Sequence, residues 1–290
     1  MTTQISAPLN GTNIPDGETS GDAGVRIPLL GLGTWPMTGD ECTEAVSSAL
    51  EAGYRHLDTA ENYGNEDAVG RAVVGSGLAR DEVFVTSKFN RRWHGPVDSV
   101  RAGLEAALER AGLDYFDLYL VHWPNPDQGS YVQACESLVE LTGTGLIRSW
   151  GVSNYKPAHL QQVLEAGLVP AVNQIHCQPL FAQPHVQEAN AAAGVLTAAY
   201  TPIGRGSELL QQPAITRIAS RLGRTPAQVV LRWHVQQGRI ALPKSADPQR
   251  QRENLDVFSF ELTAEDLATV DALDSATPSD SFMDADEFGH

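Results

Sequence analysis

Short β-rich apolar runs alternate with amphipathic runs along the chain from residue 25 onward. Eight runs have the length and the β-branched and aromatic content of strands. They cover residues 26–34, 54–58, 82–88, 116–122, 147–153, 171–177, 195–201 and 239–245. Apolar residues between them recur at helical spacing, as in Cys42, Ala45, Val46, Ala49 and Leu50, and in Val100, Leu104, Ala107, Leu108 and Ala111. The pattern predicts a succession of β-then-α units.

Residues that favour helix starts stand where amphipathic runs begin. Thr225 and Gln228 have the spacing of a capping box, with Pro226 at the first helical position, and Thr38 and Glu41 have the same spacing. Both sites are therefore predicted helix starts.

Eight β-then-α units indicate an α/β fold of the (β/α)8 TIM-barrel type, a single domain with eight parallel strands. We place this barrel at residues 25–275, with residues 1–24 as a flexible arm or hairpin and residues 276–290 as a C-terminal tail. The alternative is a doubly wound open sheet. Its nearest dinucleotide motif, GLGTWP at residues 31–36, has proline where the third glycine should stand.

Composition narrows the function. The net charge of −16 and the pI near 4.8 argue against a nucleic-acid partner, which needs a basic face. No stretch has the apolar length of a membrane span, and the N-terminal residues lack the features of a signal peptide. Cys42, Cys135 and Cys177 form no disulfide or zinc pattern. We expect a cytoplasmic monomer with no membrane partner.

Reactive side chains stand where predicted strands end. Asp58, Lys88 and His122 close the second, third and fourth strands, and Tyr63 follows five residues after Asp58. Each alone has a structural explanation, such as a helix cap, a solvated strand end or a core histidine. In a barrel, however, the strand ends face one shared, partly desolvated mouth, where buried charges need partners.

Together these four residues suit carbonyl reduction. Hydride transfer to a carbonyl leaves an alkoxide that needs a proton, and a free phenol with a pKa of about 10 is a weak donor at neutral pH. An ammonium at Lys88 would lower the pKa of Tyr63, and a carboxylate at Asp58 would keep Lys88 charged. His122 would donate a hydrogen bond to the carbonyl oxygen or help to relay the proton.

Two further groups suit a nucleotide. Ser153, Asn154 and Gln174 are neutral hydrogen-bonding residues at adjacent strand ends, which suits an amide, and Tyr200 offers a flat ring. In LPKSADPQRQREN, residues 242–254, Asp247 and Pro248 have the pattern of a helix start. Helix amides together with two cations would favour a phosphate there. The cations are Lys244 and Arg250, with Ser245 between them in the chain.

The chain resembles the aldo-keto reductase superfamily, most closely the short bacterial members of the 2,5-diketo-D-gluconate reductase type. The resemblance rests on GYRHLDTAENYGNE, VTSK, LYLVHWP, IRSWGVSNY, VNQI, AYTPIGRG, LRWHVQQG and LPKSADPQRQREN. It implies an NADP-dependent enzyme of the alcohol dehydrogenase type, acting on CH–OH, that reduces the carbonyl of small-molecule aldehydes or ketones to an alcohol. Tyr63 would be the proton donor, with Asp58, Lys88 and His122 completing the catalytic tetrad.

The resemblance also implies the cofactor contacts. The carboxamide of NADP(H) would lie against Ser153, Asn154 and Gln174, and its ring would stack on Tyr200. The 2′-phosphate would lie against Lys244, Ser245 and Arg250, and the adenosine end against Glu253 and Asn254. The family usually has a glutamate two residues after the residue that matches Gln174, and a His-Pro pair shortly after that. Here the chain has His176, Cys177 and Gln178 instead.

The substrate pocket is less well specified. Trp35, Phe89, Trp93 and Trp123 follow the first, third and fourth strands and would form an aromatic wall. The resemblance places the tail 276–290 near the pocket mouth.

Two other functions fit parts of the pattern. A barrel metallohydrolase could use His56, Asp58, Lys88, His122 and His176 around a divalent metal. It would leave Tyr63, Tyr200 and the phosphate-like site without a role. A non-catalytic sensor of nicotinamide nucleotides would need no intact set of reactive residues.

Overall fold

The computed structural model describes residues 5–9, 24–278 and 282–290. Its strands are β1 (Ser6–Pro8), β2 (Arg26–Pro28), β3 (Leu32–Gly33), β4 (His56–Asp58), β5 (Phe84–Phe89), β6 (Leu118–Val121), β7 (Trp150–Ser153), β8 (Val172–His176), β9 (Leu196–Tyr200) and β10 (Ile240–Leu242). Its α-helices are α1 (Gly39–Ala52), α2 (Glu66–Gly75), α3 (Val97–Ala111), α4 (Tyr131–Thr142), α5 (Pro157–Glu165), α6 (Pro184–Ala192), α7 (Pro213–Leu222), α8 (Pro226–Gln236), α9 (Pro248–Leu255) and α10 (Ala264–Asp271). Short 3₁₀ turns are η1 (Glu61–Tyr63), η2 (Arg80–Glu82), η3 (Arg91–Trp93), η4 (Pro126–Gln128), η5 (Gly204–Gly206) and η6 (Glu208–Gln211).

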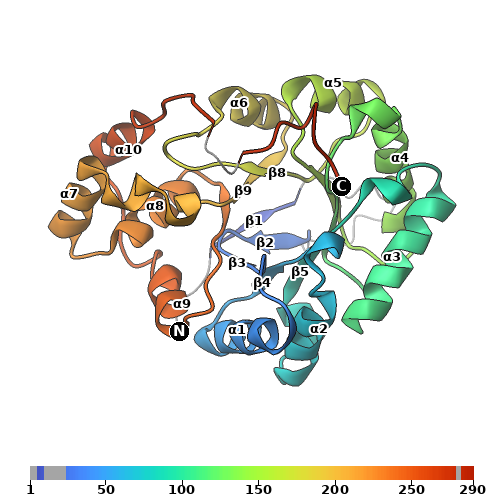
Figure 1. The fold of residues 1–290 in the computed structure, drawn as a ribbon, viewed down its shortest axis with the longest axis horizontal. Helices are drawn as coiled ribbons and strands as arrows, with labels where there is room; N and C mark the ends of the chain where they lie inside the picture. The colour runs from blue at the N-terminus through green and yellow to red at the C-terminus, as the bar shows by residue number, and fades with distance from the viewer. Residues whose placement is uncertain (1–4, 10–23, 279–281) are drawn as a thin grey trace.

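Strands β3 to β10 form one parallel sheet in sequence order. A parallel bridge between Leu30 and Ala241 joins its first and last edges, and the Gly31 N–H donates to the Ala241 carbonyl at 2.9 Å. Helices surround the sheet in Figure 1. The predicted (β/α)8 barrel is confirmed, and the carboxyl ends of its strands share one face.

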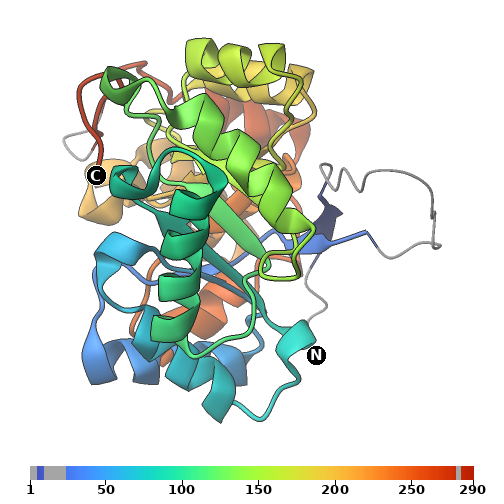
Figure 2. The same ribbon diagram turned by 90° about the vertical axis from the view of Figure 1, so that its right-hand side faces the viewer.

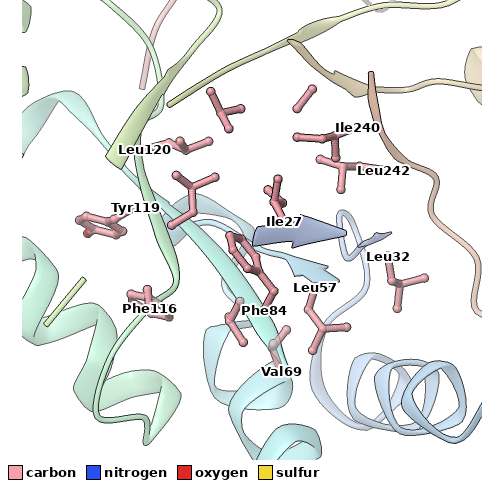
Figure 3. Packing of buried hydrophobic residues seen from close by; sticks show 14 of the residues in the cluster. Ile27, Leu32, Leu57, Val69, Phe84, Phe116, Tyr119, Leu120, Ile240 and Leu242 are labelled. Carbon is pink, nitrogen blue, oxygen red and sulfur yellow. The ribbon is translucent and has the colours of Figure 1, made fainter. Parts of the chain in front are cut away.

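The predicted first strand, residues 26–34, is wrong as a single element. Arg26–Pro28 pairs antiparallel with Ser6–Pro8, and Leu32–Gly33 forms the separate strand that pairs with β4 in the barrel sheet. The antiparallel bonding continues one residue past Pro28, where the Leu29 N–H donates to the Ile5 carbonyl at 3.0 Å, so residues 26–28 pair with β1 rather than with the barrel sheet. Ile27 is buried and points among barrel residues such as Leu120 and Ile240, as Figure 3 shows. The β1–β2 pair lies at the end of the barrel opposite the C-terminal residues, as Figure 2 shows.

The other residues of the predicted arm, 1–4 and 10–23, lie outside the described part of the chain.

The helix patterns hold in the structure. All the apolar residues that predicted α1 and α3 are buried. The Thr225 capping box is confirmed, with the Thr225 hydroxyl accepting from the Gln228 N–H. The Thr38 capping box is wrong: Thr38 has extended backbone but makes no side-chain cap bond. The next residue, Gly39, has a φ of 55°, so the first turn starts irregularly and Thr38 is not aligned with its amides. Within the described ranges, every helix is too short or too polar to cross a membrane.

Candidate active site

The register of the sheet places Asp58, Lys88 and His122 on the same interior face. Asp58 is paired with Thr86, which is two residues before Lys88, and Lys88 is paired with Leu120, which is two residues before His122. Side chains two residues apart on a strand point to the same side. The three reactive side chains therefore rise in steps around the barrel and meet at its carboxyl end.

The Lys88 ammonium joins this group. Its side chain is fully buried, and it donates to Asp58 Oδ1 at 2.6 Å, to the Thr59 carbonyl at 3.0 Å and to the Tyr63 hydroxyl at 3.3 Å. These acceptors occupy all three ammonium hydrogens. The carbonyl of Thr59 was not predicted, because a backbone acceptor leaves no residue-type signal in the sequence.

Burial and charge oppose each other in this group. Burial would lower the pKa of Lys88, but Asp58 and Tyr63 outweigh it and hold the Lys88 pKa above its ordinary value. Burial raises the pKa of Tyr63, and Lys88 only partly reverses this effect. The expected net lowering of the Tyr63 pKa is therefore not seen. At neutral pH, Tyr63 keeps its proton beside a charged lysine.

His122 faces Tyr63 across the mouth. The two rings lie 5.9 Å apart between centroids, with an interplanar angle of 77°. Burial, with smaller contributions from Lys88 and His290, lowers the pKa of His122 well below its usual value. A neutral imidazole keeps one N–H donor and one acceptor nitrogen, so His122 can donate a hydrogen bond without adding a positive charge.

The neutral residues predicted to hold an amide form a connected network. Tyr200 donates to Asn154 Oδ1 at 2.8 Å, and Asn154 donates to Ser153 Oγ at 3.1 Å. Ser153 donates to the Gln174 carbonyl at 2.9 Å. The Gln174 side-chain amide donates to Asp58 Oδ2 at 2.7 Å, which links this network to the Lys88 ion pair.

The predicted helix start at Asp247 is confirmed, but its amides are already engaged. Asp247 Oδ1 accepts from the N–H groups of Gln249 and Arg250 at 2.8 and 3.2 Å. These two amides therefore already have a protein acceptor, which the prediction of a phosphate site at this helix start did not anticipate. The Lys244 and Arg250 side chains are exposed beside this turn.

The neighbouring residues that were predicted to contact a nucleotide lie on the same segment. Ser245 is buried and accepts from the Asp247 N–H at 3.1 Å. Glu253 accepts from the Gln249 side-chain amide at 2.9 Å, and Asn254 is buried.

The four aromatic residues predicted to line a pocket separate into two pairs. Trp35 is 40% exposed and stacks under the Arg205 guanidinium at 4.0 Å, and Trp123 lies next to His122. Phe89 is fully buried against Tyr119, because it follows the inward-facing Lys88 and therefore points outward. The Trp93 ring packs on α3, so neither Phe89 nor Trp93 is placed as an open wall.

Residues 282–290 lie across the mouth of the barrel. Lys156 binds Asp284 and Asp286, both at 2.5 Å. The Phe288 ring packs edge-on against Trp123 at 5.0 Å, and the His290 ring lies 5.6 Å from that of His122. The sequence carries no helix or strand signal here, so these ring contacts could not be predicted.

The profile of the aldo/keto reductase family matches residues 29–275 of the chain. This is most of its length. The chain belongs to the aldo/keto reductase family.

Relatives within this family are close. The chain is 48% identical over 252 residues to an aldo-keto reductase of Mycolicibacterium vanbaalenii, covering 87% of this chain and 90% of the relative. It is 44% identical over 253 residues to the methylglyoxal reductase DkgA of Yersinia pestis, covering 87% and 90%. A mutant of Gox0644 solved in complex with NADPH is 38% identical with a TM-score of 0.86, covering 98% of this chain and 97% of that one.

His176 occupies the place where the family pattern leads one to expect a glutamate. Its ring is buried and lies 5.4 Å from Tyr200 and 5.8 Å from Phe181. Burial lowers the pKa of His176 to about 4, so it supports Tyr200 as a neutral ring.

The ligand set of the metallohydrolase alternative is not assembled. Among residues 5–9, 24–278 and 282–290, no three His, Cys, Asp or Glu side chains are grouped so that they could hold a metal ion. His56 is instead bonded to the Pro28 carbonyl and the Thr86 hydroxyl, at 3.2 and 3.1 Å.

Proposed function

We propose that this aldo/keto reductase reduces the carbonyl of aldehydes or ketones to an alcohol and uses NADPH as the hydride donor. The observation that carries the proposal is the buried Lys88 ammonium, which contacts both the Asp58 carboxylate and the Tyr63 hydroxyl. A purely structural ion pair would not need a partly exposed phenol as its third member.

Tyr63 is the proposed general acid. Lys88 donates to the phenol oxygen, so the phenol hydrogen can be donated to a carbonyl oxygen at the mouth. As that proton leaves, the negative charge that develops on Tyr63 lies next to the ammonium. Asp58 keeps Lys88 protonated throughout, and the neutral His122 orients the carbonyl with a hydrogen bond.

The residues present suit NADPH. The partly exposed Tyr200 ring offers a stacking face, and Ser153, Asn154 and Gln174 lie beside it with hydrogen-bonding groups. When bound, NADPH supplies the hydride. Because Gln174 already donates to Asp58, we assign it a double role, in holding the carboxamide and in orienting the carboxylate.

The 2′-phosphate is assigned to side chains rather than to helix amides. Lys244 and Arg250 are exposed cations on either side of the α9 start, with Ser245 between them and Glu253 and Asn254 further along toward the adenosine. Arg250→Ala should weaken NADPH binding about tenfold, roughly 1.4 kcal/mol, and leave NADH binding within twofold. Fluorescence titration with both nucleotides measures this. Equal affinity of the parent for NADPH and NADH would remove the phosphate assignment.

The pocket is assigned to Trp35, Trp123 and the rings of Phe288 and His290. Since the relative DkgA is named a methylglyoxal reductase, the first substrate panel should contain methylglyoxal beside keto sugars and aromatic aldehydes. Because Phe288 and His290 pack beside Trp123 and His122 at this mouth, we propose small carbonyl compounds as the first substrates to test.

The decisive experiment compares the parent with Tyr63→Phe in NADPH oxidation. The variant keeps the ring but loses the hydroxyl, so its turnover should fall about 10²- to 10⁴-fold, with NADPH affinity unchanged. Near-parental activity in Tyr63→Phe would refute the assignment of the acid. Lack of turnover by the parent on the whole panel, despite NADPH binding, would instead favour the sensor alternative.

A further inference from the structure

The proton donor and the lysine beside it are carried by two separate segments. Tyr63 lies in the three-residue turn η1, and Lys88 lies near the end of β5. The hydrogen bond between their side chains is 3.3 Å, so a small shift of η1 relative to β5 would break it.

One buried carboxylate joins these two segments. Glu61 Oε2 accepts from the backbone N–H of Asn90 at 3.0 Å, and Glu61 Oε1 accepts from the indole N–H of Trp93 at 2.9 Å. The Arg92 guanidinium also binds Glu61 Oε1. The Glu61 side chain is only 7% exposed, although its arginine partner is 64% exposed.

The position of Glu61 in the chain gives this contact its significance. Glu61 is two residues before Tyr63, and its backbone partner Asn90 is two residues after Lys88. The carboxylate therefore ties the two segments together right beside the Tyr63–Lys88 contact. Charge-assisted bonds to a buried carboxylate are among the stronger ones in proteins.

The loop that supplies the donors is itself anchored. A Cβ added at Gly103 of α3 would lie 2.7 Å from the Trp93 ring, so the indole packs directly on the helix backbone at this point. Trp93 is thus held by α3 on one side and by Glu61 on the other. Trp93, which was expected in the substrate pocket, is therefore engaged in these two contacts.

We infer that Glu61 is a positioning residue, which keeps the Tyr63 hydroxyl in reach of Lys88 by fixing η1 to the loop after β5. The inference rests on the proposed function of Tyr63. Glu61 acts on Tyr63 through the backbone of η1, which carries both residues, and its hydrogen bonds are made to the loop after β5.

A matched control lies just before β6, where it bonds to the start of β5. Asp117 is a buried carboxylate that accepts from the Val85 N–H at 2.9 Å and binds Arg80 and Arg148 at 2.9 and 3.0 Å. It therefore resembles Glu61 in burial and in partners, but it lies at the opposite end of β5. Asp117→Asn should lower stability without changing turnover.

The test measures kcat, KM, NADPH affinity and the isotope effect with NADPH deuterated at the transferred position. Glu61→Ala should lower kcat about tenfold, with KM and NADPH affinity within twofold, and should raise the isotope effect on kcat because chemistry becomes slower. Glu61→Gln, which keeps one acceptor oxygen, should recover part of the loss. A kcat within twofold of the parent in Glu61→Ala, or an equal fall in Asp117→Asn, would overturn the inference.

Two further measurements keep the outcome clear. If Glu61→Ala does not fold, Trp93→Phe offers a second variant, which removes one donor to Glu61 while keeping a ring against α3. Its kcat should fall two- to threefold. An unchanged kcat in Trp93→Phe would count against the positioning role of Glu61. Hydrogen exchange tests the tie between η1 and the loop after β5 independently of turnover. The backbone amide of Tyr63, which donates to the Ala60 carbonyl at 3.0 Å, should exchange faster in Glu61→Ala than in Asp117→Asn. Faster exchange of the Tyr63 amide in Glu61→Ala than in Asp117→Asn, combined with unaffected turnover in Tyr63→Phe, would refute Tyr63 as the acid. It would still support the tie that Glu61 makes between η1 and the loop after β5.

Discussion

The Asp58–Lys88 ion pair leads to a sharp prediction about stability. Asp58→Asn keeps the size of the side chain and removes its charge, which leaves the Lys88 ammonium fully buried without a counter-charge. Lys88 would retain the Thr59 carbonyl and the Tyr63 hydroxyl, which are neutral acceptors. The expected loss in the free energy of unfolding is about 3–5 kcal/mol at pH 7, the usual result of breaking a buried pair on one side.

The structure bounds this loss in two ways. At 2.6 Å the pair attracts by about 6 kcal/mol for an effective dielectric constant near 20, which offsets a desolvation cost of several kcal/mol for each ion. An unpaired Lys88 can also escape by releasing its proton, at about 1.4 kcal/mol for each pH unit below a pKa of about 10.4. That escape limits the loss to about 5 kcal/mol at pH 7 and to about 2 kcal/mol at pH 9.

The sign of the pH effect follows from linkage. In Asp58→Asn the folded protein holds Lys88 with a depressed pKa, so it binds fewer protons than the unfolded chain. The stability difference from the parent should therefore shrink as pH rises from 7 to 9.

Urea unfolding of four proteins tests the reasoning: the parent, Asp58→Asn, Lys88→Met and the double variant. The double variant carries neither charge and should be more stable than either single variant. The reasoning is refuted if Asp58→Asn loses less than 1 kcal/mol, or if the double variant loses the sum of the single losses.

Two further predictions concern packing and acid stability. Gly70→Ala in α2 should lower the free energy of unfolding, measured in urea, by about 1–3 kcal/mol, because the added Cβ would lie 1.6 Å from the Ala111 carbonyl oxygen. Gly75→Ala, at an open position of the same helix, should raise it by up to about 1 kcal/mol. A gain in stability in both variants would contradict the close packing at Gly70. Burial lowers the pKa of His56 from 6.5 to about 4, so as pH falls the unfolded chain takes up this proton at a higher pH than the folded protein does. The free energy of unfolding should therefore decrease by on the order of 3 kcal/mol as pH falls from 6.5 to 4. His56→Asn should show a shallower loss over that range, and an unchanged slope would argue against a neutral buried His56.

Some site positions follow from local pattern, and others do not. Asp58, Lys88 and His122 could be placed at the mouth because strand ends in a parallel barrel share one face. The same alternation could have excluded Phe89, since a residue next to the inward Lys88 must point outward. The error at Thr38 arose because capping-box spacing does not reveal the backbone of Gly39.

The sequence by itself determined the order of strands and helices, the barrel class and the residue types at the strand ends, because period and punctuation are local properties of the chain. Only the tertiary structure decided the contacts between distant segments. Gln174 reaches Asp58 across 116 residues, and Glu61 finds its partners 29 to 32 residues away. Those contacts depend on barrel closure, strand register and loop packing, which bring together side chains whose spacing in the sequence carries no period.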